Sequence, residues 1–188
     1  MATLPPRGIL YLIACGSSAA TEIVEPGVRA AQEVGWEVCV ITTPSGRNFL
    51  NMPRLAQLTG HPVRSEYKLP DTPDLLPRAD ALLVYPASFR TINTWAVGDS
   101  ATLAVGLLCE YLGLKAPIVA VPCIGTGSGL DTHPAFLEHL AKLKAWGVRI
   151  LYQPEKYPPR NAIPAPIVLE ELDRLLLERQ TQPPAQNG

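Results

Sequence analysis

The sequence lacks the clusters of residues that mark several large classes of protein. Its charges nearly balance, with 16 basic and 17 acidic residues spread along 188 positions, so no basic patch points to nucleic acid. The apolar run from Ile9 to Cys15 is too short to cross a bilayer and carries no signal-peptide cleavage pattern. We therefore expect a cytoplasmic protein that binds neither nucleic acid nor a membrane.

Clusters of cysteine and histidine are also missing. The four cysteines stand far apart, with no C-x-x-C pair and no Cys/His group at metal-ligand spacing. This excludes a disulfide framework and a zinc site, and we expect buried, reduced thiols and no metal. The glycine motifs G-x-G-x-x-G and G-K-S/T are absent too, which excludes a dinucleotide fingerprint and a P-loop.

The residues that are present describe one globular domain. A hydrophobic content of 47% over 188 residues is enough for a substantial core. Apolar runs of strand length alternate with longer helical patterns, which predicts an α/β fold: a three-layer, Rossmann-like, doubly wound parallel sheet. The expected strands cover residues 7–15, 37–42, 81–85, 117–121 and 148–152, and the expected helices 19–34, 47–58, 100–112, 133–146 and 163–180. Residues 1–180 form this domain, and the Pro/Gln-rich residues 181–188 a disordered tail.

The loops that follow the first three strands are the expected ligand site. Carboxyl ends of parallel strands meet at one edge, so loops 16–20, 42–49 and 86–99 should converge there, with loop 122–131 approaching them. Gly16, Ser17 and Ser18 open the first helix, where free N–H groups and the helix dipole suit an anion. Serines are equally preferred as ordinary helix N-caps, so both interpretations stay open.

Residues 79–104 read ADALLVYPASFRTINTWAVGDSATLA. Here Pro86, Ala87, Ser88 and Thr91 resemble the Pro-Ala-(Ser/Thr)-Ala-Asn-Thr signature of a flavoprotein family that includes phosphopantothenoylcysteine decarboxylase and the peptidyl-cysteine decarboxylases. The segments GSSAA, TTPSGRNF and HPAFLEHLAKLKAWGVRIL resemble further parts of that family, and the similarity runs from about residue 7 to residue 151.

This resemblance implies that flavin mononucleotide (FMN) binds at the carboxyl edge. Ser17 and Ser18 would hold the phosphate with help from Ser45 or Ser88. By the same resemblance, Thr42 and Phe49 would flank the ribityl chain and the ring, although a core position suits Phe49 equally well. The implied cofactor-binding set also includes Gly16, Pro86, Ala87 and Thr91. The resemblance further implies a homo-oligomer, a trimer or a multiple of trimers, with flavin at the subunit boundary.

The chain departs from the pattern of the decarboxylases at three places. Asp71 or Thr72 stands where the family has a histidine, and Arg90 replaces the signature Asn. Of the family's Pro-x-Met-Asn-x-x-Met-Trp loop, only Pro122 remains. We therefore expect altered chemistry, for which Arg90 and Asp71 are the only catalytic candidates. Arg90 adds a permanent cation that suits an anion, or it pairs at the surface with a nearby carboxylate; Asp71 would act as a base only if it were desolvated.

Three functions remain open at this point. The first is an FMN-dependent enzyme, a decarboxylase-like lyase or an oxidoreductase, acting on an unknown small-molecule or peptide substrate. The second is a non-catalytic FMN-binding or regulatory module that acts through protein partners. The third is an enzyme for a nucleotide or sugar phosphate without flavin, which is disfavoured because Thr42, Thr43 and Pro44, rather than an acidic residue, follow the second strand.

Overall fold

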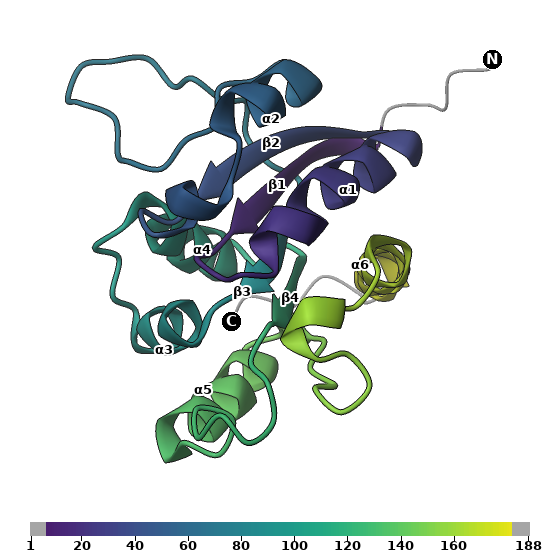
Figure 1. Cartoon of the computed structure of the whole chain (residues 1–188). Coiled ribbons are helices and arrows are strands. Elements are labelled where there is room, and N and C mark those ends of the chain that lie inside the picture. The colour runs from purple at the N-terminus through teal and green to yellow at the C-terminus, as the bar shows by residue number, and fades with distance from the viewer. Residues whose placement is uncertain (1–6, 182–188) are drawn as a thin grey trace, which may run out of the picture.

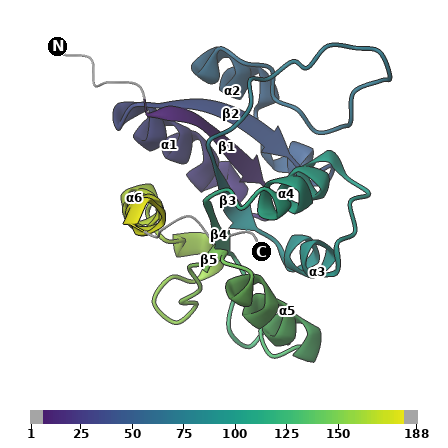
Figure 2. The same ribbon diagram turned by 180° about the vertical axis from the view of Figure 1, so that it is seen from behind.

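The computed structural model describes residues 7–181, which form an open parallel sheet with helices on both faces (Figures 1 and 2). All pairings between neighbouring strands are parallel, in the order β2-β1-β3-β4-β5. This order reverses direction between β1 and β3, as in doubly wound folds that bind ligands at that point. The strands are β1 Gly8–Ala14, β2 Trp36–Thr42, β3 Ala81–Ala87, β4 Ile118–Pro122 and β5 Arg149–Ile150. The predicted fold class is confirmed.

The strands are continuous apolar runs because both faces of the sheet are covered. In β1, Leu10 and Leu12 face one core cluster, while Tyr11 and Ile13 face the other. Successive side chains of a strand point to opposite faces, which explains this division. The first cluster is covered by α1 (Ala20–Glu33) and α6 (Ala165–Thr181), with a contribution from α2 (Met52–Thr59); the second is covered by α3 (Phe89–Val97), α4 (Leu103–Gly113) and α5 (Pro134–Ala145).

The third strand and the segment after it differ from the prediction. The strand does not stop before Pro86 but runs through it to Ala87, where the pairing with β4 shifts register. A proline, which has no N–H to donate, is accommodated at such an irregularity. Most of the segment expected to be the loop 86–99 forms the helix α3 instead. The Ser88 side chain caps this helix by accepting a hydrogen bond from the Thr91 N–H at 3.2 Å.

Two other predicted elements were too long. The helix expected at 47–58 is divided into a 3-10 turn, Gly46–Phe49, and α2. The Asn51 side chain caps α2 by accepting from the Arg54 N–H, and a proline in the first turn favours a helix start at that position. The strand expected at 148–152 contains only Arg149–Ile150, at the edge of the sheet.

The C-terminal part contains a second 3-10 turn, Pro159–Asn161, and then α6, which ends at Thr181. The disordered tail predicted for 181–188 therefore lies, beyond Thr181, outside the described residues. Within residues 7–181, no helix combines the length and the apolar content that a membrane span requires.

Gly46 holds the loop after β2 against the end of β1. A side chain at this position would overlap the Thr42 hydroxyl and lie 2.8 Å from the Ala14 carbonyl oxygen. Both neighbours are buried and one of them is backbone, so neither can move aside without disturbing the sheet edge.

We predict that Gly46→Ala lowers the free energy of unfolding by about 1–3 kcal/mol, as overpacking of a buried site does. Gly113→Ala is the matched control, since a side chain at Gly113 would meet nothing within 4 Å. Because alanine is also the better helix former, the control should leave stability unchanged or slightly raised. Urea denaturation followed by circular dichroism measures both variants. Equal stability of the two variants would contradict the assignment.

Candidate functional site

A cavity of about 150 Å³ lies at the carboxyl edge of the sheet, between the loops after β2 and β3 and the segment before α4. Hydroxyl groups dominate its lining, and its only charged side chains are Arg90 and Asp99. The full lining is Thr43, Pro44, Ser45, Ser88, Arg90, Thr91, Thr94, Asp99, Ala101, Thr102 and Val105. Predicted site residues Ser45, Ser88, Arg90 and Thr91 are thus brought together around one space.

Backbone hydrogen bonds between the strand ends position these loops. The Cys15 N–H donates to the Pro86 carbonyl at 3.0 Å, and the Cys123 N–H donates to the Ala87 carbonyl at 3.0 Å. The Thr43 N–H donates to the Ala14 carbonyl at 3.1 Å. Pro86 and Ala87 therefore act through buried backbone groups that hold the loops on either side of β3.

The two neighbouring threonines after β2 have different surroundings. Thr42 is fully buried, and its hydroxyl donates to the Ala14 carbonyl at 2.9 Å. Thr43 lines the cavity, where its Oγ1 accepts from the N–H groups of Gly16 and Gly46, each at 3.2 Å. The Thr43 and Ser45 hydroxyls are 3.4 Å apart. The structure therefore places the predicted residue Thr42 beneath the cavity, whereas Thr43, which the sequence analysis did not name as a site residue, supplies a hydroxyl on the cavity side.

The start of α1 lies beside this cavity. Gly16 is next to the Ser45 side chain, since a Cβ on Gly16 would stand 2.7 Å from the Ser45 Oγ. Ser17 accepts a weak hydrogen bond from the Ala19 N–H at 3.3 Å, and Ser18 is exposed. The N-cap residue of α1 is Ala19, so neither serine is the helix cap that the sequence allowed, and the Ser18 side chain is exposed.

Phe49 lies apart from the cavity lining. Its half-buried ring packs against the core cluster beneath α1 and α6, on the opposite face of the sheet from α3 and α4. Phe49 therefore occupies the core position that the sequence analysis gave as its alternative to contact with the ring.

The first turn of α3 forms the wall that carries the cation. The Ser88 and Thr91 hydroxyls are 3.0 Å apart, and Arg90 is exposed at the rim. The expected ion pairs of Arg90 are not formed: Asp74 pairs with Lys68 at 2.8 Å, and the Asp99 carboxylate accepts from the Ala101 N–H at 3.0 Å. The guanidinium is therefore available to an anion in the cavity.

Buried thiols lie next to this wall. Burial raises the pKa of the Cys15 thiol, although hydrogen bonds with Thr91 and Ser88 act in the opposite direction. Burial also raises the pKa of Cys123 to about 12, and the nearby Cys15 adds to this. Both groups are neutral thiols at physiological pH, so neither serves as a thiolate nucleophile.

Asp71 and Thr72 lie in the loop before β3 and do not line this cavity. Both are exposed, and the Thr72 hydroxyl donates to the Leu69 carbonyl at 2.6 Å. The burial that would make Asp71 a base is therefore absent.

The glycine-rich loop after β4 contains hydrogen bonds between its own residues. The Asp131 carboxylate accepts from the Gly127 N–H at 2.8 Å and from the Ser128 hydroxyl at 3.4 Å. The Gly127 hydrogen bond is the main reason that the pKa of Asp131 lies below its usual value.

The donor set of the cavity suits an anion that accepts many hydrogen bonds. Hydroxyl groups, the N-terminus of α3 and the Arg90 guanidinium, which forms no ion pair within residues 7–181, converge on the same space. A phosphate monoester is such an anion. Among residues 7–181, no group of three His, Cys, Asp or Glu side chains is arranged to hold a metal.

A model of the family described as Flavoprotein matches residues 4–169 of the chain. No curated protein matches it at a significant level.

Several solved structures share the fold. The cysteine decarboxylase TvaF of thioviridamide biosynthesis, described as FMN-dependent, is 18% identical with a TM-score of 0.70, covering 91% of this chain and 99% of its own. The FMN-binding protein AtHal3 is 20% identical with a TM-score of 0.71, covering 94% and 100%. The epidermin biosynthesis protein EpiD from Staphylococcus aureus is 24% identical with a TM-score of 0.64, covering 76% and 81%.

Proposed function

The chain belongs to the Flavoprotein family, and on that premise we propose that it binds FMN, with the phosphate in the hydroxyl-lined cavity. The observation that carries the proposal is the convergence of the Ser45, Ser88 and Thr91 hydroxyls with the unpaired Arg90 at the start of α3. Hydroxyls and a guanidinium are hydrogen-bond donors, and a phosphate dianion needs several of them.

The size of the cavity limits which part of FMN it holds. Drug-sized ligands occupy pockets of roughly 300–1,000 Å³, whereas this cavity has about 150 Å³. The phosphate and the adjoining part of the ribityl chain are therefore its occupants, and the ring lies outside it. Thr43, which lines the cavity, joins the phosphate donors. Ser17 and Ser18 at the start of α1 do not line it, and their part in holding the phosphate rests on the family resemblance.

We further propose that the protein is a flavin-dependent enzyme whose chemistry differs from cysteine decarboxylation. Bound FMN supplies a ring that accepts and returns electrons. The residues that would complete the decarboxylase site are replaced: the exposed Thr72 has no imidazole, and Arg90 stands in place of an amide. The reaction is then a decarboxylase-like lyase or an oxidoreductase step on a small molecule or peptide.

The alternative is a non-catalytic FMN-binding module that acts through protein partners. It is favoured by one observation: the cavity lining contains no histidine, cysteine or buried carboxylate that could transfer a proton. Under either function we place the protein in the cytoplasm, where its four free cysteines remain reduced.

FMN binding is tested by replacing two serines. We predict that the purified protein is yellow, with near-stoichiometric FMN, and that Ser17→Asp combined with Ser88→Asp abolishes retention, because the new carboxylates repel the phosphate. Absorbance and fluorescence of the flavin released on denaturation measure the occupancy. Ala141→Asp, on the exposed side of α5, is the control for an added charge and should stay yellow. Full retention by the double variant would show that the phosphate lies elsewhere.

The reaction is tested with peptides that end in cysteine. We predict that the FMN-loaded protein releases no more CO₂ from them than an FMN-free sample does, because no residue of the described site replaces the imidazole. The measurement is the release of isotope-labelled carbon dioxide from these peptides. Clear turnover would contradict the altered chemistry. A stable protein partner captured without redox cycling of the flavin would favour the regulatory alternative.

We also propose a homo-oligomer, a trimer or a multiple of trimers, as the family resemblance implies. Val97 and Leu137 are more than half exposed and come from α3 and α5, two helices that pack together. Contact with another copy would cover such side chains. Light scattering is expected to give a mass of three chains or a multiple of three, and Val97→Glu with Leu137→Glu to reduce it. A monomer in the unmodified protein would overturn this prediction.

A further inference from the structure

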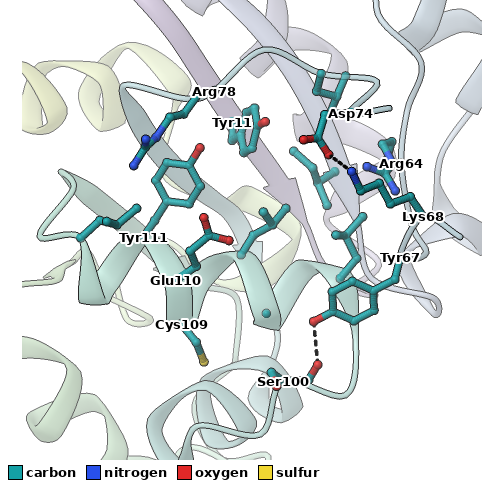
Figure 3. A pocket seen from close by; sticks show the side chains of 16 residues that line it. Tyr11, Arg64, Tyr67, Lys68, Asp74, Arg78, Ser100, Cys109, Glu110 and Tyr111 are labelled. Carbon is teal, nitrogen blue, oxygen red and sulfur yellow. Dashed lines mark hydrogen bonds and ion pairs between the residues drawn. The ribbon is translucent and has the colours of Figure 1, made fainter. Parts of the chain in front are cut away.

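A second and larger cavity, of about 740 Å³, lies between α4 and the loop of residues 64–78 (Figure 3). We call it the loop cavity. Its volume is within the range of sites for small molecules and short peptides. Its lining combines three tyrosines, both signs of charge and an apolar floor, and no function described above uses it.

Three tyrosine hydroxyls keep this loop at a fixed distance from the sheet and α4. Tyr67 donates to the Ser100 carbonyl at 2.7 Å, and Tyr11 donates to the Pro77 carbonyl at 2.6 Å. The Tyr111 hydroxyl accepts from the Ala79 N–H at 2.9 Å. The loop is thus anchored near both of its ends, so the cavity is a constructed space with defined walls.

The position of the Tyr67 ring against α4 depends on Gly106. A side chain at Gly106 would overlap the Tyr67 hydroxyl and lie 2.9 Å from the adjoining ring carbon. A residue without a side chain at this helix position therefore lets the phenol lie against α4 and close one end of the loop cavity.

The charges around the loop cavity are only partly neutralised. Lys68 and Asp74 form an ion pair at 2.8 Å. Arg78 and Glu110 line the cavity, are exposed, and form no ion pair with any residue in the part of the chain that the structure describes. Arg64 also lines it, but its guanidinium already donates to the Glu66 carbonyl at 2.9 Å. One free guanidinium and one free carboxylate therefore line the same cavity, and in the view of Figure 3 they lie on either side of the Tyr111 ring.

The floor between these charges is apolar. Leu76 comes from the loop, while Leu103 and Leu107 come from successive turns of α4. Side chains of this kind favour an apolar group between the two charged ends of a ligand.

We propose that the loop cavity binds a short zwitterionic peptide of two or three residues with apolar side chains. Its carboxylate pairs with Arg78, which can present two N–H donors, and its ammonium pairs with Glu110. Its side chains cover Leu103 and Leu107. A phosphate ester could pair with Arg78 but would leave the Glu110 carboxylate without a partner, whereas a zwitterionic peptide pairs with both.

This cavity borders the proposed flavin site. Ser100 and Leu103 line the loop cavity, while Asp99, Ala101 and Thr102 line the hydroxyl-rich cavity. One short segment before and into α4 therefore forms a wall of both. A peptide in the loop cavity would lie across this segment from the proposed phosphate site, and only a role for it as the substrate rests on the proposed function.

The proposal is tested by calorimetry with three probes: Leu-Leu, its N-acetyl derivative and its C-terminal amide. We expect Leu-Leu to bind about tenfold more tightly than either derivative, since each derivative loses one charge-assisted contact. Arg78→Gln should remove the preference for the acid over the amide but keep the preference for the free amine. Glu110→Gln should do the reverse. Lys144→Gln and Glu138→Gln, both exposed on α5, are the matched controls and should change neither preference.

The proposal would be overturned if the three probes bound with equal affinity or if none of them bound. It would also be overturned if both preferences persisted in the two variants. Loss of probe binding together with a change in oligomeric mass in Arg78→Gln would also overturn it, because the cavity would then be an interface between copies. The titrations are run with and without FMN, so a protein that binds Leu-Leu but no flavin would refute the proposed function and leave this site standing.

Discussion

Backbone hydrogen bonds between the ends of β1, β3 and β4 are the interaction on which the rest of the site depends. The amides of Cys15 and Cys123 donate to the carbonyls of Pro86 and Ala87, from opposite sides of the same strand. A strand that ends inside a protein leaves polar groups that must be paired, because an unpaired buried amide is expensive. Pairing them draws three loops together, and their hydroxyl groups then face one small space. The polar character of the site therefore follows from the way the buried sheet ends.

The segment from Asp99 to Leu103 extends this arrangement to the second cavity. Its residues are divided between the two cavities, with Thr102 on the hydroxyl-rich side and Leu103 on the loop side. Thr102 also caps α4 by accepting from the Val105 N–H at 3.4 Å. The same residues that start α4 thus separate a cavity suited to a phosphate from one suited to an apolar, charged-ended ligand.

The fold followed from the sequence because the signals involved are local or periodic. Apolar runs of strand length alternate with helical patterns, and parallel strand order brings their carboxyl ends together. Where the structure differs from the sequence interpretation, the reason is a contact between distant residues. Which of Thr42 and Thr43 faces the cavity depends on how β2 sits beside β1, and Pro86 stays in a central strand because β4 shifts register there. The loop cavity could not be predicted from the sequence for the same reason. Its walls are fixed by hydrogen bonds of the Tyr11 and Tyr111 hydroxyls to residues that lie 66 and 32 positions away in the sequence.

Arg90 gives the proposed flavin site a different electrostatic character from one built on an amide and an imidazole. A guanidinium remains charged at every physiological pH, so it stabilises an anion but cannot exchange protons with a substrate. The neighbouring thiols are neutral because burial raises the pKa of Cys15 and Cys123. The Asp99 carboxylate accepts a hydrogen bond from the Ala101 N–H in the turn before α4. A site with a fixed cation, hydroxyl donors and no titrating group near neutrality is suited to holding an anion in place. On the proposed function, this fixed cation holds the phosphate of the flavin, and the groups that line the cavity serve binding before proton transfer.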